Sequence, residues 1–79
     1  MTPSGIATDS NGNVWIANYG HGFGSVTEIP AVNPNIPIVY QGSNYQFAAP
    51  FGITADKFDN IWITNNDGAS VTELVKVKN

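Results

Sequence analysis

The segment with the most chemical potential is a glycine-rich loop, residues 19–24, which holds the only histidine of the chain. His21 could act as a general base or as a hydrogen-bonding group, since imidazole titrates near neutral pH. Tyr19 and Phe23 flank it and could provide stacking surfaces for a ring. A glycine-rich loop cradles a phosphate when it leads into a helix, and no helical pattern follows this one. The alternative interpretation is a solvated loop with an exposed histidine.

An asparagine comes directly before this loop and before a second loop, residues 66–69, which holds the equivalent place later in the chain. Asn18 precedes the first loop, and Asn65 precedes the second. Recurrence at equivalent positions favours a structural task, such as tying down the next loop through side-chain hydrogen bonds. We predict no catalytic residue and no metal ligand. The predicted ligand-binding set is Asn18, Tyr19, His21, Phe23, Asn65, Asn66 and Asp67.

The acidic residues offer two further interpretations. Residues 9–13 place oxygen-bearing side chains at alternate positions, as in a calcium loop. The glycine of this segment falls at the wrong place for an EF-hand. A similar segment that begins at Asp56 does not keep the alternate spacing of oxygen-bearing side chains. We therefore expect Asp9 and Asp56 to form turns rather than a calcium site. Glu28 and Glu73 could be taken for a general acid and a general base. Each ends the same short run, S-V-T-E, so the two occupy the same position along their strands, and this favours a solvated place on an outer strand. We predict no cofactor.

Composition excludes several classes of protein. The 79 residues include three Lys, no Arg and six acidic residues, for a net charge of −3. A nucleic-acid binder needs a basic patch, and a membrane-spanning segment needs about 18 apolar residues, so neither partner is expected. Residues 1–4 do not resemble a signal peptide. A chain this short without cysteine is expected to be only marginally stable as an isolated monomer.

The chain contains an internal repeat. Residues 3–18 match residues 50–65 at 8 of 16 positions, with an offset of 47. The run S-V-T-E at residues 25–28 returns at residues 70–73 with an offset of 45, so the first copy has a connecting loop two residues longer. Self-similarity at this period indicates a repeat architecture.

Within the repeat, all local signals predict β-structure. Glycine and proline occur too often for a helix, and the four apolar residues 14–17 are typical of a strand covered on both faces. Pro37 predicts an edge strand, because proline cannot donate to the ladder. The predicted strands are residues 5–8, 14–17, 25–29 and 36–40 in the first copy, and residues 52–55, 61–64 and 70–77 in the second.

The predicted fold is therefore all-β, built from antiparallel sheets of the kind found in β-propeller blades. Four strands repeating every 40 to 50 residues are the signature of such a blade. Residues 1–43 would form one full blade, residues 44–49 a linker, and residues 50–79 three strands of a second blade without its fourth strand.

Both copies carry the pattern P-x-G-I-x-x-D-x-x-x-N-[VI]-W-I-x-N, followed by a glycine- and asparagine-rich loop and S-V-T-E-[IL]. This pattern resembles NHL-type β-propeller repeats, especially the bacterial branch that includes streptogramin-lyase-like proteins. The resemblance spans nearly the whole chain and implies a ring of roughly six or seven blades. It also implies that the loops after the second strands lie around the channel entrance, where ring-arranged amides could bind a sugar or another small polar ligand.

With fewer than two blades, the chain is expected to be completed by other copies of itself or by the rest of a longer chain. We expect a non-enzymatic scaffold or binding module, because one histidine cannot supply the several histidines and acids that a lyase-like site would gather from different blades. Two alternatives stay open: part of a lyase- or lactonase-like enzyme, and a structural protein that forms a ring or fibre through edge strands. Lys76 and Lys78 would then moderate pairing at the last edge. The low charge resembles that of secreted bacterial propellers and implies an extracellular or periplasmic location.

Overall fold

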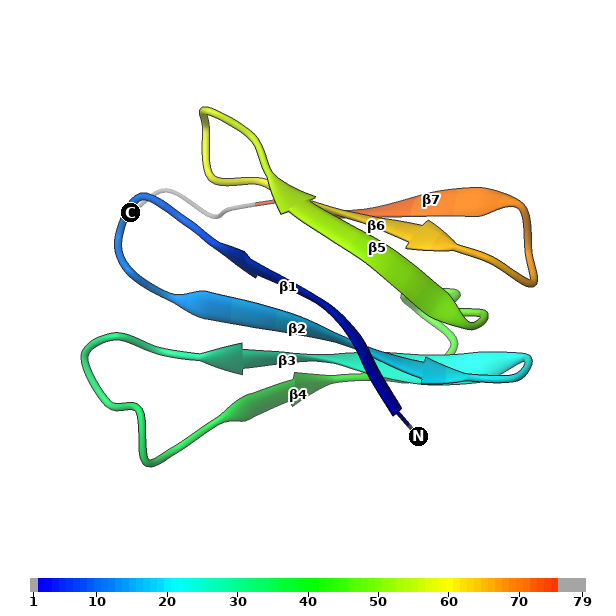
Figure 1. Cartoon of the computed structure of the whole chain (residues 1–79), viewed down its shortest axis with the longest axis horizontal. Helices are drawn as coiled ribbons and strands as arrows, with labels where there is room; N and C mark the ends of the chain where they lie inside the picture. Colours follow the sequence, from blue (N-terminus) through cyan, green and yellow to red (C-terminus); the bar gives the residue numbers. More distant parts are fainter. Residues whose placement is uncertain (1, 76–79) are drawn as a thin grey trace.

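A computed structural model describes residues 2–75, which form two antiparallel sheets and no helix (Figure 1). The first sheet has the strand order β1-β2-β3-β4 and the second the order β5-β6-β7. The strands are β1 (Thr2–Thr8), β2 (Val14–Gly20), β3 (Phe23–Ile29), β4 (Ile38–Tyr40), β5 (Pro50–Ala55), β6 (Ile61–Asn65) and β7 (Ser70–Leu74). The prediction of an all-β fold with four strands and then three is confirmed. Across residues 2–75, no helix is long and apolar enough to cross a membrane.

Each of the strands β1 to β6 differs from its predicted bounds at one end, by one to three residues. β1 begins at Thr2 rather than at Gly5, because pairing with β2 continues past an irregularity between Pro3 and Gly5. β4 begins only after Pro37, whose ring cannot join the ladder, and it is the edge strand of its sheet, as predicted. β7 ends at Leu74, before the predicted end at residue 77, and residue 75 is not in a strand. Residues 76–77 of the predicted strand, and both Lys76 and Lys78, lie outside the described residues.

The two sheets are structural copies with the same register. Trp15 lies opposite Glu28 in the first sheet, and Trp62 lies opposite Glu73 in the second. Side chains alternate between the two faces of a strand, so each sheet has two distinct faces. The tryptophan face carries Trp15, Ala17, Val26 and Glu28 in the first sheet and Trp62, Thr64, Val71 and Glu73 in the second. The isoleucine face carries Val14, Ile16, Thr27 and Ile29 in the first sheet and Ile61, Ile63, Thr72 and Leu74 in the second.

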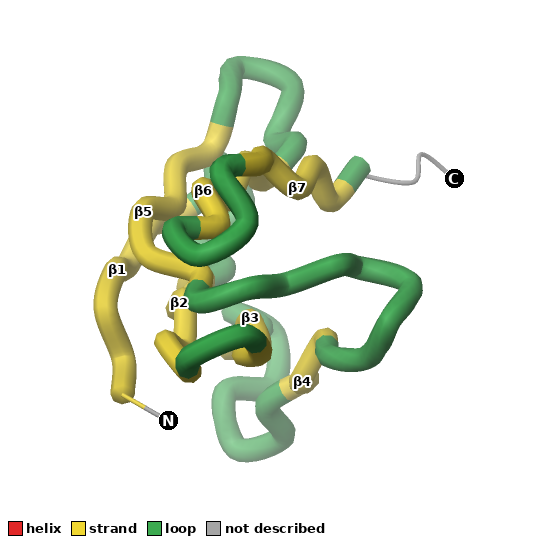
Figure 2. Tube along the Cα trace, turned by 90° about the vertical axis from the view of Figure 1, so that its right-hand side faces the viewer, coloured by secondary structure: helices red, strands yellow, loops and turns green. Residues whose placement is uncertain are grey.

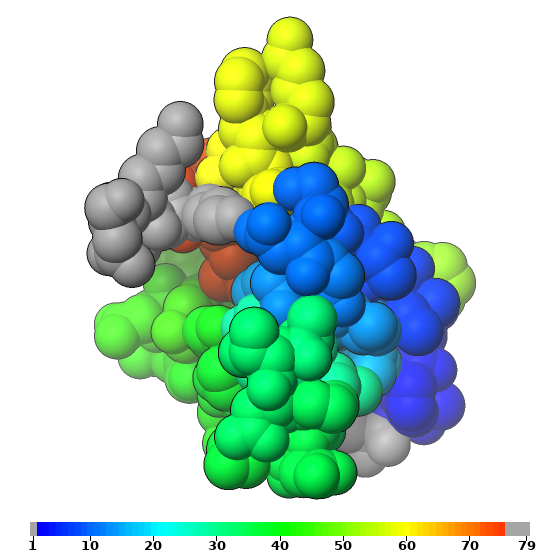
Figure 3. All heavy atoms as spheres, turned by 90° about the vertical axis from the view of Figure 1, so that its left-hand side faces the viewer, coloured from blue at the N-terminus to red at the C-terminus, as the bar shows by residue number. Residues whose placement is uncertain are grey.

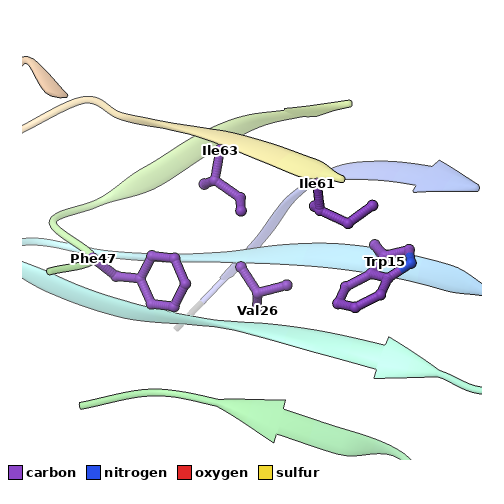
Figure 4. Packing of buried hydrophobic residues seen from close by; sticks show 5 residues of the cluster. All are labelled: Trp15, Val26, Phe47, Ile61 and Ile63. Atoms are coloured by element: carbon purple, nitrogen blue, oxygen red, sulfur yellow. The ribbon is translucent and has the colours of Figure 1, made fainter. Parts of the chain in front are cut away.

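The core lies where the tryptophan face of the first sheet packs on the isoleucine face of the second (Figure 4). The buried cluster consists of Trp15, Val26, Phe47, Ile61 and Ile63. Phe47 comes from the linker between the sheets, and its ring lies next to Val26, at the end of the cluster away from Trp15 (Figure 4). Burial of this apolar surface is the main stabilising contribution that a chain without disulfides can draw on.

The first strands of the two sheets, β1 and β5, lie side by side at one edge of the stack, and β4 and β7 lie at the other edge (Figure 2). The Ser4 hydroxyl crosses between β1 and β5 and donates to the carbonyl of Pro50 at 2.9 Å. Gly5 allows this close approach, since a Cβ there would come within 2.8 Å of the Phe51 carbonyl oxygen.

Each sheet is covered on one face only. In the second sheet the tryptophan face is open, with Trp62 38% and Val71 59% exposed. In the first sheet Trp15 is buried, whereas Ile16 on the opposite face is only half-buried. Within residues 2–75, residues 14–17 are therefore covered on one face, and the expected cover of the other face by a neighbouring sheet stays a prediction.

Candidate functional site

The structure brings the predicted loop residues together at one end of the stack. The backbone N–H of Gly22, between β2 and β3, donates to Asp67 Oδ2 at 2.6 Å, between β6 and β7. His21 Nδ1 lies 3.8 Å from the same carboxylate oxygen, and the Tyr19 hydroxyl lies 3.4 Å from that nitrogen. Three members of the predicted set, from both copies of the repeat, therefore share one hydrogen-bonding group.

This loop cluster, which comprises Tyr19, His21, Phe23, Asn66 and Asp67, is an open surface rather than a cavity. The side chain of His21 is 86% exposed, and Phe23 is 57% exposed. The Tyr19 ring stands edge-on to Phe51, with 6.4 Å between the ring centroids. Within residues 2–75, no three His, Cys, Asp or Glu side chains converge in a way that could hold a metal ion.

The linker fixes the two loops relative to each other through backbone hydrogen bonds. The Ala49 N–H donates to the carbonyl of Phe23, and the Ala49 carbonyl accepts from Asn66, both at 3.0 Å. The Asp67 N–H donates to the carbonyl of Ala48 at 3.1 Å. Asn66 thus joins the loop cluster through its backbone, and residues 48–49 hold the loop of one sheet against the loop of the other.

Asn18 and Asn65 tie strands and linker together, as the structural interpretation expects. Asn18 Nδ2 donates to Thr27 Oγ1 at 2.9 Å, and Asn65 Nδ2 donates to Thr72 Oγ1 at 2.8 Å. The oxygen of Asn65 also accepts from the Ala48 N–H at 3.2 Å. Because Asn65 is only 2% exposed, its amide serves the fold and presents almost no surface to a ligand.

Two aspartate turns lie at the opposite end of the stack, which Figure 3 shows with residues 9–13 beside residues 56–60. Asp9 accepts hydrogen bonds from the amides of Asn11 and Asn13 through one oxygen and from Trp15 Nε1 through the other. Asp56 repeats this pattern, with Trp62 Nε1 at 2.9 Å. Both oxygens of each carboxylate are occupied by N–H donors, so the turns serve as caps, as the favoured interpretation predicted.

These contacts lower the pKa of both carboxyl groups. Burial raises the pKa of Asp9, but hydrogen bonds from Trp15, Asn13 and Asn11 outweigh it and hold the value below 3.8. For Asp56 the indole N–H of Trp62 makes the largest contribution and lowers the pKa in the same direction. The charged forms therefore stabilise the folded chain.

We expect the chain to lose stability as the pH falls below about 3.8, the ordinary value for both groups, because the unfolded chain then binds protons that the folded chain excludes. Above that pH the full contribution is present. The double substitution Asp9→Asn with Asp56→Asn should flatten this part of the profile, measured by urea unfolding at a series of pH values. Glu73→Gln, which removes an exposed carboxylate outside the turns, should keep the original acid slope. A double variant with an unchanged slope would contradict the assignment.

The sequence did not predict a cavity of about 560 Å³ between the sheets, on the side of β4 and β7. Its lining includes Trp15, Tyr40, Tyr45 and Glu28, and none of the seven predicted binding residues. Tyr40 stacks on Trp15 with 5.6 Å between centroids, and its hydroxyl donates to Glu28 Oε1 at 2.8 Å. Burial and the neighbouring Glu28 carboxylate raise the pKa of Tyr40.

Glu28 therefore differs from its prediction as a solvated carboxylate. It lies half-buried on the face that packs against the second sheet, opposite Trp15 and Ile38. The linker carries aromatic residues, Tyr45 and Phe47, that must be buried somewhere, but this signal does not say where Glu28 lies.

Comparison with protein-family models gave no match, and comparison with curated proteins gave none either. The similarity to NHL-type repeats therefore stays a prediction from the motif. What the chain does has to be inferred from the two stacked sheets, their open faces and the loop cluster.

Proposed function

We propose that the chain is a non-enzymatic β-propeller segment, a scaffold whose two sheets are completed by further sheets of the same repeat from other copies or from the rest of a longer chain. The observation that carries the proposal is the pairing of unlike faces. One tryptophan face packs on one isoleucine face, and one face of each kind is left open. The open tryptophan face of the second sheet corresponds in the repeat to the packed tryptophan face of the first, and the open isoleucine face of the first sheet corresponds to the packed one of the second. The two open faces should therefore fit each other as the packed faces do.

Exposed apolar side chains support this proposal. Trp62 and Val71 lie on the open tryptophan face, and Ile6 beside the open isoleucine face is 69% exposed. Large apolar side chains exposed on the open faces of two sheets favour interaction sites there, since soluble proteins seldom leave apolar patches uncovered. A contact between unlike faces propagates, and it closes into a ring when the rotation per unit allows. The adjacent first strands β1 and β5 suit such a ring, because blades meet along their inner strands.

We propose that the loop cluster is the ligand-binding part of this scaffold. His21 and Asp67 come from different repeats, and Tyr19 and Phe23 add aromatic surface beside them. A ring of such units would place one polar and aromatic cluster at each junction between sheets on one face. Such a face suits a small polar ligand, with a sugar as the leading class, because sugars combine stacking with hydrogen bonds.

Replacement of Val71 by glutamate should abolish assembly, because the new charge would be buried against an apolar isoleucine face. We expect the unmodified chain to have a solution mass several times 8.4 kDa and Val71→Glu to have the mass of one chain, measured by light scattering after gel filtration. Val32→Glu is the matched control, since Val32 is 97% exposed in the loop before β4 and lies on neither open face. It should assemble like the unmodified chain.

Two results would contradict the proposal. One is an unmodified chain that stays a folded monomer of 8.4 kDa with both faces open in water, which would contradict completion by other copies. The other is equal assembly of Val71→Glu and the unmodified chain, which would place the contact elsewhere. Circular dichroism of both glutamate variants separates loss of assembly from loss of folding.

A further inference from the structure

Among the described strands, β7 has no counterpart of the partner strand that β3 has. In the first sheet β4 pairs with the outer edge of β3, with Val26 opposite Tyr40 and Thr27 opposite Val39. In the second sheet β7 pairs with β6 on one side, and no strand of residues 2–75 pairs with its other edge. Because β3 and β7 share the run S-V-T-E, the two edges present the same sequence to a partner.

The first sheet shows how such a partner is held. The ring of Tyr40 stacks on Trp15 at an interplanar angle of 23°, and its hydroxyl donates to Glu28. Stacking and a hydrogen bond to a charged acceptor both favour tyrosine at this position over any other residue. Trp15 is 8% exposed as a result of this contact and of the second sheet.

The second sheet has the same arrangement of tryptophan and glutamate, but within residues 2–75 no tyrosine lies over the tryptophan. Trp62 lies opposite Glu73, as Trp15 lies opposite Glu28. The indole N–H of Trp62 donates to Asp56, just as that of Trp15 donates to Asp9, so both rings are held in the same way. Trp62 is nevertheless 38% exposed, and within the described residues no aromatic ring stacks on it.

The cavity between the sheets runs along the same edge. Four consecutive residues, 72–75, line it from the β7 side, and Tyr40 and Tyr45 line it from the other. Side chains of an added strand would alternate between the two faces of the sheet. One would therefore lie over Trp62, and its neighbour would enter the cavity.

We propose that the free edge of β7 is a binding site for an extended peptide segment with a β-branched residue followed by tyrosine, as in the Ile-Val-Tyr of β4. The segment pairs antiparallel with residues 71–73 by strand addition, which supplies backbone hydrogen bonds as the source of affinity. Its tyrosine stacks on Trp62 and donates to Glu73, and the preceding valine fills the cavity beside Tyr45. The inference rests on the proposed function in treating the second sheet as an incomplete copy of the first, but it does not require whole sheets to stack.

The test uses a synthetic peptide with the sequence of residues 35–42, titrated into isotope-labelled protein and followed by NMR. We expect shifts in the backbone amides of residues 70–75 and in the Trp62 indole N–H. A peptide with phenylalanine in place of tyrosine should bind about tenfold more weakly, because it lacks the hydrogen bond to a carboxylate. With Glu73→Gln protein, where the charge is absent, the two peptides should differ by less than about threefold. A scrambled peptide should leave all signals unchanged.

Three results would overturn the inference: no shift at residues 70–75 with millimolar peptide, equal binding of the scrambled peptide, or a tyrosine preference that Glu73→Gln leaves intact. The outcome is separable from that of the proposed function. A chain that stays monomeric and still binds the peptide contradicts the assembly and supports the edge site. A chain that assembles and ignores the peptide does the reverse.

Discussion

Replacement of Gly24 by alanine is expected to remove most of the folding free energy of the chain, about 3–4 kcal/mol, whereas the same replacement at Gly22 should cost about 1 kcal/mol. A Cβ at Gly24 would clash with the Pro50 ring and lie 2.6 Å from the Asn18 carbonyl oxygen. Neither neighbour can move independently, since Pro50 is buried at the start of β5 and Asn18 belongs to β2. The new methyl group would therefore push the second sheet away from the first.

Gly22 isolates the backbone contribution. Its φ of +69° favours glycine, but a Cβ there meets nothing within 4 Å. Alanine at this position pays only the cost of the left-handed conformation, partly offset by a less flexible unfolded chain. Both replacements add one methyl group within the same hairpin at a positive-φ glycine, +69° at Gly22 and +155° at Gly24, so their difference mainly reflects the clashes of the new Cβ with Pro50 and Asn18.

The measurement is thermal and urea unfolding of the two variants beside the unmodified chain. A chain of this size has a folding free energy of about 5 kcal/mol, so Gly24→Ala should lower the Tm by roughly 20 °C or leave the chain unfolded at room temperature. Gly22→Ala should stay folded with a Tm about 5 °C lower. Equal losses at the two positions would show that the sheets do not approach each other as closely at Pro50 as the structure has them.

The strands and turns were predictable because the repeat supplies each signal twice. A match of Trp15 with Trp62 and of Asp9 with Asp56 leaves little freedom for the strand register. The contact between the loops of His21 and Asp67 also follows from the repeat, since equivalent loops of two sheets stacked in the same orientation lie at the same end.

Two features could not be predicted, for physical reasons. Residues 14–17 are apolar on both faces, and apolarity says that a face avoids water without saying what covers it. The cavity depends on Tyr40 and Tyr45, which lie in an edge strand and a linker that carry no repeat partner in the chain. The position of Glu28 under Tyr40 follows from that same edge strand and was missed with it.

A strand with the sequence of β4, appended to the chain, should stabilise the fold by about 2 kcal/mol, or roughly 10 °C in Tm. With the offset of 45, residue 80 of an extended chain would correspond to Asn35, so residues 35–42 can be appended directly after residue 79 with the spacing of the first copy preserved. The appended tyrosine would then meet Trp62 and Glu73 as Tyr40 meets Trp15 and Glu28. Covalent connection removes most of the association entropy that a separate peptide has to overcome.

A matched extension with alanine in place of the appended tyrosine separates strand pairing from chain length. We expect this control to gain less than about 0.5 kcal/mol, because the ordering of eight residues offsets the backbone hydrogen bonds when no aromatic ring is buried. Thermal unfolding gives the stability of both extended chains, and the Trp62 indole signal reports whether the ring is covered. If the tyrosine and alanine extensions were equally stable, Trp62 and Glu73 would not bind the tyrosine side chain. A gain specific to tyrosine would mean that the added strand pairs with β7 and that its tyrosine covers Trp62, as Tyr40 covers Trp15.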